Sequence, residues 1–95
     1  MAAYVIVQVE VTDPDAYEVY KGQVPPTLDA FGGEFVVRGG DQEVLEGDWP
    51  WPRCVVLRFP DVASAKAWHD SEIYAAPKAL RQSASKGNMI VVEGA

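Results

Sequence analysis

Residues 3–14 read AYVIVQVEVTDP, and this stretch decides the fold. From Val5 to Val11 every second residue is a valine, and this two-residue period is that of a β-strand with one wholly apolar face. Directly after it, Asp13 offers a helix N-cap, and Pro14 suits the first helical position because no backbone donor is needed there. The stretch therefore predicts a strand over 3–12 that leads straight into a helix.

The helical segments carry their apolar residues at steps of three or four. In the first segment this stripe runs from Tyr17 to Phe31, is interrupted by Pro25 and Pro26, and ends at a pair of glycines. A second helical region is predicted from an N-cap at Asp61 to Ala84. Ser71 offers another cap near a break within it.

Three further strands are predicted, at 34–38, 53–59 and 88–93. The segment 41–52 between the first two contains two Trp-Pro pairs, which favour extended backbone, and predicts a long hairpin connection. The order of elements predicts an α+β fold: a ferredoxin-like β-α-β-β-α-β sandwich, with helices on one face of a four-stranded antiparallel sheet. One such domain over 1–95 suits a chain of this length.

Alternation also predicts what lies on the sheet face away from the helices. Phe35 and Val37 are expected on one side of their strand, and Val36 and Arg38 on the other. The far face would then hold Tyr4, Ile6, Val36, Cys54 and Val56 among Gln8, Arg38 and Arg58. Such a face is too apolar to leave in water, and it predicts a homodimer whose two sheets face each other and bury about 1,600 Å² or more.

Charge and cysteine content narrow the class of protein. Fourteen acidic against eight basic residues give a net charge of -6, which repels nucleic acid and anionic lipid surfaces. Apolar runs are too short to span a membrane. A lone cysteine, Cys54, and the lack of a signal-like start lead to the expectation of a cytoplasmic protein.

Nothing in the sequence indicates a metal or a nucleotide cofactor. One histidine does not define a metal site, and Gly39-Gly40 follows a strand without opening a helix or meeting a Walker lysine. The expectation is a protein without a cofactor.

The sequence resembles one known family along nearly its whole length. The run from Phe31 to Gly40, with Trp49 and Arg53, is similar to the domain of unknown function 1330 (DUF1330). Further matching positions are Leu45-Glu46-Gly47, Phe59-Pro60, Ala65, Ala67-Trp68, Ser71, Tyr74, Leu80-Arg81 and Glu93-Gly94. The resemblance implies a ferredoxin-like monomer that assembles as a dimeric α/β barrel. That superfamily also contains small cofactor-free monooxygenases, isomerases and lyases, whereas the family itself has no settled activity.

A basic and aromatic group is the best candidate for a ligand site. Guanidinium groups match carboxylates in bidentate geometry, so a hollow between the facing sheets that contains two of them would suit an anionic ligand. The candidate ligand-binding residues are Arg38, Arg53, Trp68, Tyr74 and Arg81. Alternatively, these arginines pair with Glu34, Glu46 or Glu93 inside the fold.

Two residues are candidates for proton transfer. Glu46 can partner an arginine, and His69, the only histidine, can act as a base if it lines a pocket beside Asp70 or Glu72. A histidine at the surface or in an interface is the other interpretation of His69. Trp49 and Trp51 are candidates for an interface or for a lid over the pocket.

Two functions from different classes remain open at this point. The first is a small-molecule binder or cofactor-independent enzyme that acts on an anionic or aromatic metabolite. The second is a non-catalytic dimeric module whose arginines serve stability alone. Neither the substrate nor the reaction follows from the sequence.

Overall fold

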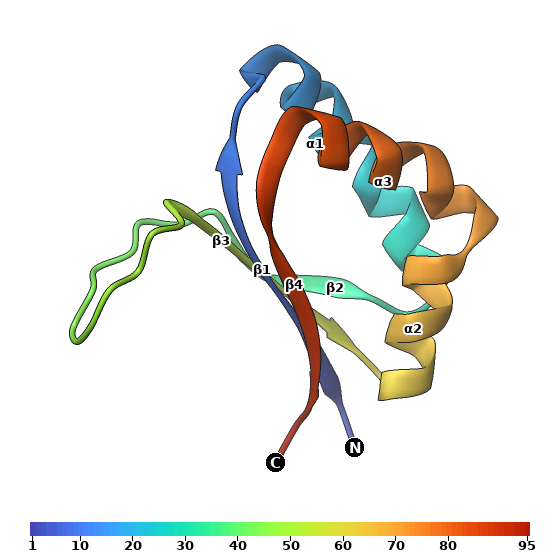
Figure 1. Cartoon of the computed structure of the whole chain (residues 1–95). Helices are drawn as coiled ribbons and strands as arrows, with labels where there is room; N and C mark the ends of the chain where they lie inside the picture. Colours follow the sequence, from blue (N-terminus) through green and yellow to red (C-terminus); the bar gives the residue numbers. More distant parts are fainter.

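The computed structural model describes residues 1–95 as one antiparallel sheet with three helices on one of its faces (Figure 1). The strands lie in the order β2-β3-β1-β4. The elements are β1 (Ala3–Val11), α1 (Pro14–Asp29), β2 (Glu34–Arg38), β3 (Arg53–Phe59), α2 (Val62–Asp70), α3 (Glu72–Ala84) and β4 (Ser85–Glu93). The α+β architecture is confirmed, and within one chain the sheet is not closed into a barrel.

Each helix begins at the predicted N-cap. Asp13 accepts a hydrogen bond from the backbone of Ala16 at 3.2 Å, and Asp61 accepts one from Ser64 at 2.7 Å, which lowers the pKa of Asp61. Ser71 breaks the second helical region in two, because its hydroxyl donates to the Trp68 carbonyl and accepts from the Tyr74 backbone. None of the three helices is long and apolar enough to cross a membrane.

The core lies between the sheet and the helices. The alternating valines of β1 face the helices, and the largest fully buried side chains there are Trp68, Tyr74 and Phe59. Trp68 stacks between the other two rings, with centroids 4.1 Å from Tyr74 and 5.4 Å from Phe59. The indole donates to the Thr27 hydroxyl at 3.0 Å. These contacts fix the Trp68 ring in one position.

Strand β4 begins three residues earlier than predicted. Gly87, expected to precede the strand, lies inside it opposite Val9, where a Cβ atom would collide with the β1 backbone. Glycine at this position permits the close approach of two strands rather than ending one.

A β-bulge in β2 changes the faces predicted for that strand. Phe35 pairs with Leu57, but Val37 pairs with Val56, so Val36 is an extra residue. Arg38 consequently lies opposite Val55, on the helix side of the sheet. The prediction that Arg38 lies on the far face is therefore wrong, as is the grouping of Phe35 with Val37.

The far face of the sheet is apolar and uncovered in one chain, and it is called the open face below. A row of four aliphatic residues crosses all four strands, in the order Ile90, Ile6, Val56 and Val37. Ile90 is 56 % exposed. Residues 39–52, the β2–β3 arm, project on this side of the sheet, away from the helices (Figure 1).

Candidate functional site

A small cavity between the sheet and the helices is lined by positively charged side chains, although the chain as a whole is negatively charged. Its volume is about 30 Å³, and most of its thirteen lining residues are apolar. The charged ones are all cationic: Lys21, Arg38, Arg53 and Arg81. In a chain with a net charge of -6, this arginine cavity is a local concentration of positive charge.

Arg38 closes one side of the arginine cavity. The bulge in β2 turns its side chain toward α1, where the guanidinium group donates to the Lys21 carbonyl at 2.8 Å. The same group lies 4.2 Å from the centroid of the Phe35 ring. Arg38 thus bridges β2 and α1 across the cavity.

Arg53 enters the cavity from the first position of β3. Alternation along the strand places it on the same face as Val55, and its guanidinium group lies 5.4 Å from the centroid of the Tyr17 ring. The backbone of Gly39, at a φ of +70°, lies so close to this guanidinium that a Cβ atom at position 39 would collide with it. The Nε atom is buried and has no hydrogen-bond partner.

Arg81 reaches the cavity from the last turn of α3. Only 8 % of the residue is exposed, and its Nε atom is also buried without a partner. The partial negative charge at the C-terminal end of a helix favours a cation there. The half-buried Arg53 of a strand and the buried Arg81 of a helix therefore each have a buried, unpaired Nε–H donor and line one cavity.

No carboxylate of the chain neutralises these three arginines. Its ion pairs join Lys21 to Glu18, Arg58 to Glu34, and His69 to Asp70. The alternative in which Arg38, Arg53 and Arg81 pair with Glu34, Glu46 or Glu93 inside the fold is therefore wrong. Lys21 is satisfied locally, so the arginines provide the uncompensated charge.

A pair of tyrosines lies beside Arg81. The hydroxyl groups of Tyr20 and Tyr74 are 2.8 Å apart and buried. Burial, and then the proximity of Tyr74, raise the pKa of Tyr20 far above its ordinary value of 10.0, although the charge of Arg81 lowers it in part. Tyr20 consequently remains a neutral hydrogen-bonding group. Tyr74 is fully buried and does not line the cavity itself, but its hydroxyl is hydrogen-bonded to Tyr20, which does.

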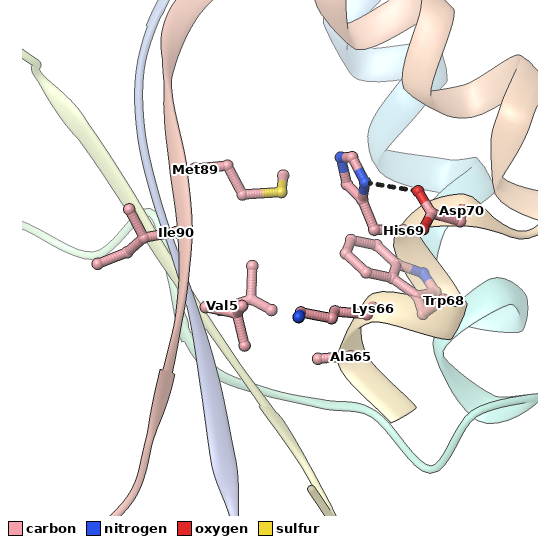
Figure 2. Close-up of a pocket in the computed structure, with 9 residues that line it drawn as sticks. Val5, Ala65, Lys66, Trp68, His69, Asp70, Met89 and Ile90 are labelled. Carbon is pink, nitrogen blue, oxygen red and sulfur yellow. Dashed lines mark hydrogen bonds and ion pairs between the residues drawn. The ribbon is translucent and has the colours of Figure 1, made fainter. Parts of the chain in front are cut away.

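The two proton-transfer candidates lie elsewhere. Glu46 is in the β2–β3 arm, where it lines a depression of about 330 Å³ with Trp49 and Cys54. His69 lies on α2 and lines a separate groove of about 160 Å³, called the His69 groove below (Figure 2). Neither residue touches the arginine cavity, whereas Trp68 lines both the cavity and the groove.

The positions of the arginines change the expected location of a ligand. The prediction placed them in a hollow between two facing sheets, but the arginine cavity lies on the helix side of the sheet, inside one chain. Tyr17 and Tyr20, which belong to the apolar stripe of the first helical segment, are buried and also line this cavity. Their positions in the apolar stripe of α1 predict that both side chains are buried, but they do not predict a cavity beside them. No cluster of three or more histidine, cysteine or acidic side chains could hold a metal ion.

Comparison with known proteins identifies the family and the fold. The family model described as "Domain of unknown function (DUF1330)" matches residues 2–95. No curated protein matches the chain.

Three solved structures illustrate the fold. A protein of unknown function from Rhodopseudomonas palustris has 20 % identity and a TM-score of 0.81, with 99 % of this chain and 82 % of that chain covered. A dimeric ferredoxin-like protein of unknown function from Jannaschia sp. CCS1 has 16 % identity and a TM-score of 0.70, with 99 % and 100 % covered. SnoaB, a cofactor-independent oxygenase from Streptomyces nogalater, has 11 % identity and a TM-score of 0.66, with 99 % and 93 % covered. At these identities the likeness concerns the fold alone.

Proposed function

This chain belongs to the DUF1330 family, and from that premise we propose that it binds a small organic anion, a carboxylate, in the arginine cavity. The observation that carries the proposal is the pair of buried Nε atoms, on Arg53 and Arg81, that have no partner. A buried donor left unpaired costs about 1–3 kcal/mol, and more when its group is charged. A bound anion would remove this cost for both groups at once.

The dimensions of the cavity favour a carboxylate head group. A water-sized group needs about 10–15 Å³ of such volume, so about 30 Å³ holds about two of them. The two oxygens of a carboxylate match this number and can accept from two guanidinium groups. The aromatic side chains of Tyr17, Phe35 and Trp68 provide apolar walls for the adjoining carbon atoms.

Cofactor-independent catalysis is a second function for the same ligand. The similarity in fold to a cofactor-independent oxygenase supports it, and so do the fixed positive charges, which would stabilise an anion formed from the substrate. Binding is the function that the cavity supports best, because Glu46 and His69 lie outside it. A base for the reaction would have to act from a neighbouring site.

A homodimer is the proposed assembly, with the open face of the sheet as its interface. Support comes from the aliphatic row across that face and from structural neighbours that are described as dimeric. Since the arginine cavity is on the opposite side of the sheet, each copy would carry its own complete cavity. A non-catalytic module would share this interface but would not bind anions at Arg81.

A thermal-shift experiment tests the proposed binding. Wild-type protein is titrated with acetate, phenylacetate and benzoate beside two variants, Arg81→Met and Arg58→Met. The proposal expects at least one acid to raise the melting temperature of wild type and of Arg58→Met, and to leave that of Arg81→Met unchanged. Arg58 is the matched control because its guanidinium is about half exposed and pairs with Glu34. Equal shifts in all three proteins, or none with any acid, would overturn the proposal.

A further inference from the structure

We infer that the arginine cavity and the His69 groove are two ends of one elongated ligand site, divided by a wall whose movable part is the side chain of Met89. This inference rests on the proposed function, because the arginine cavity holds the carboxylate. It adds the class of ligand, an aromatic acid with an oxygen substituent at the end remote from its carboxylate.

The two spaces have a common wall. Met89 and Trp68 each line both of them, and neighbouring inward-facing residues of β1, Val5 and Val7, line one each. Trp68 is held by its hydrogen bond to Thr27 and by stacking, so it cannot move aside. Met89 is the movable part of the wall: it is half-buried, unbranched, and located on an edge strand. In Figure 2 its thioether extends from β4 toward α2, opposite the His69 ring.

The volumes explain why the ligand would extend in this direction. About 30 Å³ accommodates a carboxylate but not the rest of an acid, whereas the His69 groove offers about 160 Å³. The side toward α1 is closed by the hydrogen bond from Arg38 to the Lys21 carbonyl. Displacement of Met89 would join the small space to the large one and needs no change in the backbone.

The His69 groove has the chemistry for the far end of such a ligand. Its floor is apolar, formed by Val5, Ala65 and Met89, and suits an aromatic ring. Lys66 and His69 extend into it from α2, three residues apart (Figure 2). The Nδ1 atom of His69 lies 3.4 Å from the Asp70 carboxylate, which leaves Nε2 for a ligand, and Lys66 forms no ion pair. A hydroxyl or phenolate oxygen there would meet an imidazole and an ammonium group.

The chain is well suited to a test by NMR, because His69 is its only histidine and Met89 is one of two methionines. The probes are acetate, which has only the head group, and 4-hydroxyphenylacetate, which has the ring and the far oxygen. In protein with labelled histidine and methionine methyl groups, we expect acetate to move the Met89 signal and leave that of His69. We expect 4-hydroxyphenylacetate to move both.

Variants separate this inference from the proposed function. Lys66→Gln should weaken binding of 4-hydroxyphenylacetate about tenfold, the effect of one lost charge-assisted hydrogen bond, and leave acetate binding unchanged. Lys86→Gln, an exposed lysine of β4 outside both spaces, is the control and should change neither. If 4-hydroxyphenylacetate fails to bind, or leaves His69 unmoved, while acetate binding still depends on Arg81, the elongated site is wrong and the arginine cavity stands. If Arg81→Met weakens no acid, the proposed function itself fails.

Discussion

The backbone of Gly39 lies so close to the guanidinium group of Arg53 that a Cβ atom at position 39 would collide with it. Gly39 also has a φ of +70°, where a side chain is unfavourable. The turn after β2 thus limits the space available to the Arg53 guanidinium and holds it at the arginine cavity. Glycine at this position serves the site as well as the turn.

Gly39→Ala tests this relationship directly. We expect the free energy of unfolding to fall by about 1–2 kcal/mol from the backbone conformation alone, and carboxylate affinity to fall because Arg53 must move. Gly40→Ala is the matched control, since a Cβ atom there meets nothing within 4 Å, and it should change stability by less than about 0.5 kcal/mol. Urea unfolding and calorimetric titration with a carboxylate provide both measurements. Unchanged carboxylate affinity in Gly39→Ala would show that the turn at Gly39 does not position Arg53.

Arg81→Met is expected to separate stability from binding. Removal of a buried guanidinium whose Nε has no partner should leave the unliganded protein as stable as wild type, or more stable by up to about 2 kcal/mol. A methionine at this position keeps the apolar, unbranched part of the Arg81 side chain, which is buried in the fold. Chemical denaturation without added anions measures the free energy of unfolding of both proteins. A loss of more than about 2 kcal/mol would mean that the guanidinium is satisfied within the fold.

Tyr20→Phe should change the response of stability to alkaline pH. The raised pKa of Tyr20 keeps its hydroxyl protonated in the folded chain, while in the unfolded chain it ionises near its ordinary value of 10.0. The unfolded state therefore binds fewer protons above pH 10, and stability falls as pH rises there. Without this hydroxyl, the decline above pH 10 should be shallower by up to about 1.4 kcal/mol per pH unit. Urea midpoints between pH 8 and 11 measure it, and identical slopes in both proteins would contradict the argument.

Ile90→Glu should dissociate the proposed homodimer. The side chain lies in the aliphatic row of the open face and is 56 % exposed in a single chain, so a carboxylate there would be buried without a partner in the dimer. Ile73→Glu is the control, because Ile73 is 51 % exposed but belongs to α3, on the helix side of the sheet. Sedimentation at micromolar concentration should give a monomer for the first variant and a dimer for the second. Dimers of both would place the interface elsewhere.

Much of the fold could be predicted because its signals are local. The valine alternation in β1 and the caps at Asp13, Asp61 and Ser71 each depend on neighbouring residues, and all are confirmed. The bulge in β2 could not be predicted in this way. Val36 and Val37 are both apolar, so the sequence does not mark which of them is the extra residue, and simple alternation puts Arg38 on the wrong face.

The site depends on contacts that local patterns do not encode. Arg38, Arg53 and Arg81 come from three elements, and their common cavity results from the bulge and from the packing of α3 over the sheet. Glu46 and His69 have suitable chemistry but lie outside that cavity. Whether the three arginines bind a ligand stays a prediction, as does the role of His69.

The most direct measurement follows the Nε–H signals of the four arginines by ¹⁵N NMR while a carboxylate is added. We expect the signals of Arg53 and Arg81 to shift together, with one dissociation constant, as both donors gain an acceptor, and the signal of Arg58 to remain unchanged. A carboxylate that binds while both of these signals stay in place would contradict it.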